Sequence, residues 1–181
     1  MFLKTQLSWT VSVPASSLDS EGSNLQKAIL TRLLDDFATK KASKDIGYFL
    51  AVTTLDRIGQ GIISRDSGEI QFPVDFTCIT FKMFAGEILD GVVHMVMKHG
   101  VFLRCGPADK VYLSFKKMED YEFVPGETPF FKKVGEDEDG KSRIEKGMTL
   151  RFSVIAEKYD EAEKDFKALV GLEGDCLGPI S

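Results

Sequence analysis

The stretch Phe81-Lys82-Met83-Phe84-Ala85-Gly86-Glu87-Ile88-Leu89-Asp90-Gly91 marks the point at which this sequence changes character. Before it, long alternating segments and one helical segment follow each other with few glycines. After it, short apolar segments are separated by glycine, which is typical of a sheet that coils into a small barrel. We therefore place a domain boundary near residues 80–82, with one domain over residues 1–80 and a second over residues 81–181.

The first domain has the pattern of a sheet covered by one helix. Residues 3–13 alternate apolar and polar side chains, and so do residues 70–78, which predicts two half-buried strands. Residues 46–55 are aromatic and β-branched and predict another strand. Between the strands at residues 3–13 and 46–55, apolar side chains recur every four residues over 25–37. This is the period of a helix with one buried stripe. The order β-α-β-β predicts an α+β domain with a mostly antiparallel sheet.

The second domain has the pattern of an OB barrel, a closed five-stranded β-barrel. Glycines divide residues 87–114 into three short β segments, and residues 149–156 and 166–172 add two more. Residues 119–147 look mostly loop-like. Five strands with one long polar interruption after the third are what an OB fold requires.

Composition excludes several classes of protein. The net charge of −5 argues against a protein that coats duplex nucleic acid, since that needs many cations facing phosphates. Three widely spaced cysteines do not form a disulfide framework. No run of about 18 apolar residues predicts a membrane helix. We expect a soluble cytosolic or nuclear protein with no membrane contact.

One face of the barrel combines aromatic and basic side chains. Phe102 and Arg104 share one parity of their strand, and Lys110 and Tyr112 share one parity of the next. Aromatic rings can stack on unpaired bases while cations contact phosphates, so this face predicts binding of single-stranded RNA. The alternative is that Phe102 covers the rim of the barrel and that Tyr112 is an ordinary strand residue.

The sequence holds no convincing catalytic or metal-binding set. His94 and His99 are five residues apart, which predicts opposite strand faces, and no cysteine joins them. The acidic run 136–139 does not fit the spacing of a calcium loop. The acidic residues before position 80 do not form the cluster that a metal-dependent nuclease needs. We therefore expect a protein without catalytic activity and without a cofactor.

The junction stretch quoted above resembles that of the stalk subunits of DNA-directed RNA polymerases, a family made up of subunit 7 of the nuclear enzymes and its archaeal counterpart. In that family the pattern is F-x-P-F-x-G-E-V-x-x-G. His99-Gly100-Val101-Phe102 and Gly106-Pro107 match the same family downstream, and Gly47-Tyr48 and Gly61 match it upstream. Met83 stands where the family usually has proline and Ala85 where lysine is common. These departures resemble a diverged paralogue, such as those of the plant polymerases IV and V.

The resemblance implies a fold and a set of partners. It implies a truncated RNP-like tip domain followed by an S1-type OB barrel, in a nuclear, non-catalytic stalk subunit. The partners would be polymerase subunit 4, the polymerase core near its clamp, and emerging single-stranded RNA.

It also implies roles for named residues. Gly47, Tyr48 and Gly61 would dock on the core, with Gly61 holding a tight turn at positive φ. Phe102, Arg104, Lys110, Tyr112 and His99 would meet RNA, since S1 domains place stacking residues at positions like Phe102 and Tyr112. The alternative function is a free-standing S1-domain RNA-binding protein in translation or RNA decay.

Overall fold

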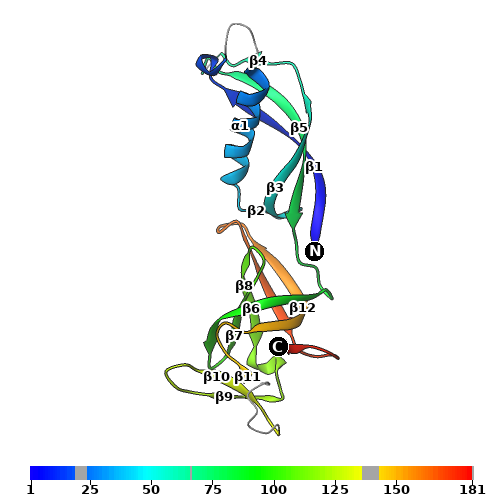
Figure 1. Cartoon of the computed structure of the whole chain (residues 1–181), viewed down its shortest axis with the longest axis vertical. Helices are drawn as coiled ribbons and strands as arrows, with labels where there is room; N and C mark the ends of the chain where they lie inside the picture. The colour runs from blue at the N-terminus through cyan, green and yellow to red at the C-terminus, as the bar shows by residue number, and fades with distance from the viewer. Residues whose placement is uncertain (19–23, 66, 136–142, 181) are drawn as a thin grey trace. The chain divides into compact units, whose positions relative to one another are not determined.

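The computed structural model describes residues 1–18, 24–65, 67–135 and 143–180 (Figure 1). The chain divides into two compact units, one of residues 2–82 and one of residues 83–181 together with Met1. In the following, residues 2–82 are called the tip unit and residues 83–181 the barrel unit. The acidic run 136–139 lies outside the described residues.

The tip unit is an antiparallel sheet with one helix. The sheet has the order β1-β5-β3-β2, and β4 pairs with β5 beside β3. Its elements are β1 (Phe2–Val13), a 3-10 turn η1 (Ala15–Ser17), α1 (Leu25–Ala38), β2 (Ala42–Ser43), β3 (Gly47–Ile58), β4 (Ile62–Ile63) and β5 (Ile70–Phe81). The predicted α+β fold is confirmed.

The helix α1 covers one face of this sheet through the stripe that the four-residue spacing predicts. Ile29, Leu33 and Phe37 are buried, and they pack with the inward-facing residues of β1 and β5. Those residues are Val11, Val13, Phe72, Val74, Phe76 and Cys78. Burial raises the pKa of the Cys78 thiol, so this cysteine behaves as an apolar side chain.

Strand β3 departs from simple alternation because it carries three β-bulges. They fall between Phe49 and Ala51, between Val52 and Thr54, and between Leu55 and Arg57. Each bulge inserts one extra residue, so the half-buried positions recur every third residue from Phe49 to Ile58. The bulges increase the local twist, and the strand runs three residues beyond the predicted end at Leu55.

The barrel unit is a closed five-stranded barrel. Its strands are β6 (Ile88–Met97), β7 (Gly100–Cys105), β8 (Ala108–Ser114), β12 (Thr149–Asp160) and β13 (Asp165–Gly171). They follow the order β13-β8-β7-β6-β12, and β12 pairs with β13 to close the ring. The pairing of β8 with β13 is parallel, whereas the other pairings of the ring are antiparallel. The predicted OB barrel is confirmed.

Alternation along the five strands fills the barrel interior. Large interior side chains such as Leu103, Leu113 and Phe152 are fully buried. A short strand, β14 (Gly178–Ile180), adds to β12 outside the ring, and a 3-10 turn η2 (Phe115–Lys117) follows β8. In the part of the chain that the structure describes, no helix is both long and apolar enough to cross a membrane.

The sequence pattern predicts a mostly loop-like segment over residues 119–147, and it does not indicate the short strands that the structure has there. The segment contains a separate three-stranded sheet of β9 (Tyr121–Val124), β10 (Phe130–Lys133) and β11 (Arg143–Ile144). Phe131 and Ile144 are fully buried, and the ring of Phe123 lies 5.4 Å from that of Phe131. Strands of two to four residues are too short to display a period of two, which explains why the sequence pattern did not indicate them.

Gly47 has the least room for a side chain among the described glycines of the tip unit. It begins β3 at φ +85°, where residues with a Cβ are strained. A Cβ at this position would lie 2.2 Å from the carbonyl oxygen of Phe81 and 2.8 Å from Cβ of Lys82. The end of β5 therefore approaches β3 at a distance that no side chain permits.

We predict that Gly47→Ala destabilises the tip unit more than Gly68→Ala does. Gly68 has φ +70°, but a Cβ added there would have no atom within 4 Å, so its substitution should cost only about 1–2 kcal/mol of backbone strain. Gly47→Ala adds a clash with backbone atoms and should cost clearly more. Denaturant unfolding followed by the fluorescence of Trp9, the single tryptophan, reports on this unit because Trp9 packs on Phe37, Phe49 and Phe76. Equal losses in the two variants would contradict this account.

Candidate nucleic-acid interface

Two aromatic rings lie side by side on the outside of the barrel. Phe102 of β7 and Tyr112 of β8 are direct cross-strand partners, and their ring centroids are 5.0 Å apart with a 42° tilt. Both are partly exposed, while Val101, Leu103, Val111 and Leu113 fill the interior. The parity predicted from the sequence is therefore correct for this pair, and the rings form a preformed apolar surface.

The β6–β7 turn holds Tyr112 in place. The hydroxyl of Tyr112 donates a hydrogen bond to the carbonyl of His99 at 2.7 Å. The same carbonyl accepts the N–H of Phe115 at 3.0 Å. Gly100 leaves room for this arrangement, since a Cβ there would lie 2.9 Å from the Tyr112 ring and 2.3 Å from the Leu113 carbonyl oxygen. The His99-Gly100 motif thus positions the tyrosine through its backbone.

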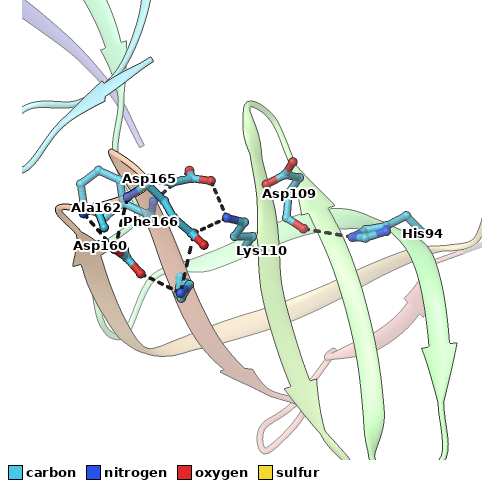
Figure 2. Close-up of polar contacts among 9 residues, drawn as sticks. His94, Asp109, Lys110, Asp160, Ala162, Asp165 and Phe166 are labelled. Atoms are coloured by element: carbon cyan, nitrogen blue, oxygen red, sulfur yellow. Dashed lines mark hydrogen bonds and ion pairs between the residues drawn. The ribbon is translucent and has the colours of Figure 1, made fainter. Parts of the chain in front are cut away.

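The structure corrects the expectation that His94 and His99 lie on opposite faces of a strand. His99 is an exposed residue of the β6–β7 turn, and only His94 lies within β6. His94 contacts the carbonyl of Asp109 through Nε2 at 3.0 Å (Figure 2). Its ring centroid lies 6.2 Å from that of Phe102. Among the described residues no group of three or more potential metal ligands occurs.

Two further apolar side chains extend the pair of rings into a row. Met95 of β6 is the register partner of Phe102, and Leu169 of β13 is the register partner of Tyr112. Met95 is 45% exposed and Leu169 36% exposed. We call Met95, Phe102, Tyr112 and Leu169 the stacking row, since it runs across four neighbouring strands.

Sequence reasoning missed both ends of the stacking row. A β-bulge between Val93 and Met95 shifts the parity of β6, so simple alternation does not place Met95 beside Phe102. Leu169 reaches Tyr112 through the parallel pairing of two strands far apart in the chain, which local periodicity does not indicate. The run of alternating apolar residues in β13 was the available signal for Leu169.

The two predicted cations of this face differ in their surroundings. Arg104 is exposed, and its guanidinium forms no hydrogen bond or ion pair with the described residues. Lys110 forms a hydrogen-bonded ion pair with Glu163 and a second ion pair with Asp165 at 3.3 Å (Figure 2). The hydrogen bond with Glu163 raises the pKa of Lys110, and the same contact lowers the pKa of Glu163. Lys110 lies on the predicted face, but its ammonium group is already paired with two carboxylates.

The predicted docking residues Gly47, Tyr48 and Gly61 lie in the tip unit. Two of them are glycines and the third is buried, so they offer almost no side-chain surface to a partner. Tyr48 is 1% exposed, so its side chain is not part of the surface of the chain. Gly61 does not have the positive φ expected of it. A Cβ at Gly61 would lie 2.5 Å from the ring of Phe72, so the glycine makes room for a core side chain. The exposed groups next to it are Ile62 and Ile63 of β4, each 68% exposed.

Comparison with known proteins identifies the family of the chain. Residues 8–68 match the family model described as the SHS2 domain found in the N terminus of Rpb7p/Rpc25p/MJ0397. Subunit 7 of DNA-directed RNA polymerase V from Arabidopsis thaliana is 54% identical over 181 residues, covering 100% of this chain and 99% of the relative. The chain belongs to the subunit 7 family of DNA-directed RNA polymerases. The resemblance seen in the sequence is confirmed.

Within the subunit 7 family, the relatives differ in their distance from this chain. Subunit 7 of polymerase IV from Arabidopsis thaliana is 51% identical and covers 99% of this chain and 100% of the relative. The polymerase II subunit RPB7 from Glycine max is 32% identical and covers 88% of this chain and 87% of the relative. A crystal structure of a putative exosome complex RNA-binding protein has a TM-score of 0.37 and 20% identity, covering 56% of this chain and 49% of that one. This last similarity is too low to support an inference.

Proposed function

We propose that this chain is the stalk subunit of a nuclear DNA-directed RNA polymerase of the type IV or V class, and that it has no catalytic activity of its own. The observation that carries this proposal is the full-length match at 54% and 51% identity to subunit 7 of polymerases V and IV. The match to a polymerase II subunit is 32% over 88% of the chain. A free-standing S1-domain protein is not favoured, because residues 8–68 match the amino-terminal domain of polymerase subunits.

The proposed partners are subunit 4 of the polymerase and the polymerase core near its clamp. Both units expose large apolar side chains that an isolated chain leaves in water, among them Phe2 at 69% and Ile88 at 58%. A partner that covers these side chains would remove their apolar area from water. The nucleus is the proposed location, since the relatives named above are subunits of polymerases.

Affinity purification of the tagged chain tests its membership of a polymerase. We expect a subunit 4 protein to be recovered in a one-to-one ratio, together with the largest subunit of polymerase IV or V. A tag on an unrelated nuclear protein of similar size provides the control. Recovery of the chain alone, or with ribosomal or RNA-decay proteins, would contradict the proposed function, and recovery of a polymerase II largest subunit would correct its class.

We infer that docking on the core uses the end of the tip unit at Gly61, through β4. This strand pairs with β5 along one side, so the pairing groups of its other side are available to a partner. Ile62 and Ile63 add exposed apolar area beside that edge.

The double variant Ile62→Ser with Ile63→Ser should reduce recovery of the largest polymerase subunit by at least about tenfold, because two buried apolar contacts of about 1.5 kcal/mol each would be lost. It is a better test than a substitution of Gly61, which would disturb Phe72. Recovery of subunit 4 serves as the measure of folding. Val134→Ser, at a residue of the barrel unit that is 57% exposed, is the matched control and should change nothing. Full recovery of the core with the double variant would show that docking uses another surface.

Binding of single-stranded RNA is proposed for the outer face of β6, β7, β8 and β13. The stacking row supplies two aromatic rings and two apolar neighbours, and Arg104 supplies a cation on the same side of β7. Stacking of a base on an aromatic side chain contributes about 1–3 kcal/mol.

The double variant Phe102→Ala with Tyr112→Ala should weaken binding of labelled single-stranded RNA more than tenfold, since about 2–4 kcal/mol of stacking is removed. The dependence of affinity on salt should stay unchanged, because no cation is lost. Titration at two salt concentrations measures both quantities, and circular dichroism establishes that the barrel is folded. Arg104→Gln is the complementary variant and should reduce the salt dependence. Unchanged affinity in the aromatic double variant would mean that the rings do not contact RNA.

A further inference from the structure

A hairpin of the barrel brings three carboxylates to the end of the stacking row that lies on β8 and β13. The hairpin joins β12 to β13, and we call Asp160, Glu163 and Asp165 its acidic clamp. Asp160 accepts the backbone N–H groups of Ala162 at 3.1 Å and of Glu163 at 3.4 Å. These bonds fix the turn, so the position of Glu163 is set by the hairpin backbone. Figure 2 shows Asp160 and Ala162 of this turn.

Two lysines lie within the acidic clamp. Val111 of β8 is the register partner of Ala168 of β13, so Lys110 and Lys167 occupy neighbouring positions one residue earlier on each strand. Lys110 pairs with Glu163 and Asp165, and Lys167 pairs with Asp160 at 2.7 Å and with Glu163 at 3.7 Å. Three carboxylates thus face two ammonium groups, which leaves these five groups with one net negative charge.

The members of the acidic clamp differ in what they contribute to the fold. Asp165 is fully buried and accepts the N–H of Phe166 at 2.9 Å, so its charge needs compensation within the structure. Lys110 supplies part of this compensation at 3.3 Å. The Glu163 side chain is 47% exposed and has no such need. An exposed ion pair of this kind contributes little to stability.

We propose that Glu163 competes with RNA phosphates for Lys110, so that this face selects single strands by stacking of bases and not by the charge of the backbone. The proposal rests on the proposed binding of RNA to the stacking row. Lys110 and Tyr112 point to the same side of β8, about 7 Å apart along the strand. An RNA strand whose base stacks on Tyr112 therefore brings a phosphate within reach of Lys110. The charge of that lysine is already compensated by Glu163. Glu163 acts on specificity without contacting a base.

Glu163→Gln tests this inference because it removes one charge and keeps the shape of the side chain. It leaves the pairs of Lys110 with Asp165 and of Lys167 with Asp160 intact. Lys110→Ala would be a poor test, since it removes an ion-pair partner from a buried carboxylate. The matched control is Glu173→Gln. Glu173 pairs with Lys117 at 2.9 Å and is 67% exposed, so its substitution also removes an exposed carboxylate from a lysine and changes the net charge equally.

The measurement is fluorescence anisotropy of labelled single-stranded RNA on the full-length chain, co-purified with subunit 4 where the chain alone is not soluble. A salt series is recorded for each protein. Glu163→Gln should raise the affinity roughly threefold or more at low salt and steepen the slope of log K against log salt by about 0.7, the value for one added phosphate contact on a single strand. Glu173→Gln should leave both unchanged.

The outcomes separate this inference from the proposed function. No change in Glu163→Gln, or an equal increase in Glu173→Gln, would overturn the competition while binding to the stacking row still stood. The Phe102→Ala, Tyr112→Ala variant is measured alongside, and its unchanged affinity would overturn the RNA face and with it the role of Glu163. Thermal unfolding of each variant shows whether the barrel is intact.

Discussion

The parallel pairing of β8 with β13 is the contact on which the barrel depends. It joins residues 111–113 to residues 168–170, and with the antiparallel pair of β12 and β13 it closes the sheet into a ring. Closure leaves the ring strands without free edges, which would otherwise pair with other chains. The same pairing places Leu169 beside Tyr112 and Lys167 beside Lys110. The outer face of the barrel therefore owes the Leu169 end of its apolar row, and the position of Lys110 beside the acidic clamp, to one contact between distant segments.

In the tip unit the corresponding constraint is that a single helix covers one face of the sheet. The other face is polar, as is usual for an antiparallel sheet with one solvated side. On that face Asp56 accepts the hydroxyl of Thr77 at 2.7 Å, the hydroxyl of Thr54 at 2.8 Å and the amide of Gln6 at 3.5 Å. These hydrogen bonds hold the pKa of Asp56 below its ordinary value, and the bond from Thr77 has the largest effect. The carboxylate is therefore a hydrogen-bonded surface group of the polar face.

Those features that depend on local periodicity could be predicted from the sequence. The buried stripe of α1, the alternation of β1 and β5, and the shared face of Phe102 and Tyr112 all follow from spacings of two or four residues. Features that depend on register between distant segments could not. The bulge before Met95 reverses the parity of β6, and β9 to β11 are too short to show a period. Lys110 looked like a free cation because its partner Glu163 lies 53 residues further along the chain.

The ion-paired Lys110 bears on the RNA binding that we propose for this chain. A chain with a net charge of −5 repels a nucleic acid at long range, and the acidic clamp adds a local negative charge beside the stacking row. A free RNA-binding protein would lose affinity and association rate for both reasons. A polymerase subunit is affected less, because the enzyme that makes the transcript holds it at a high effective concentration near its own subunits. Weak stacking on the aromatic rings would then suffice to bind the transcript. Because the transcript must keep moving as it is made, the absence of strong phosphate contacts would not hold it back. An acidic chain with an aromatic outer face is thus easier to reconcile with a subunit of a polymerase than with an independent RNA-binding protein.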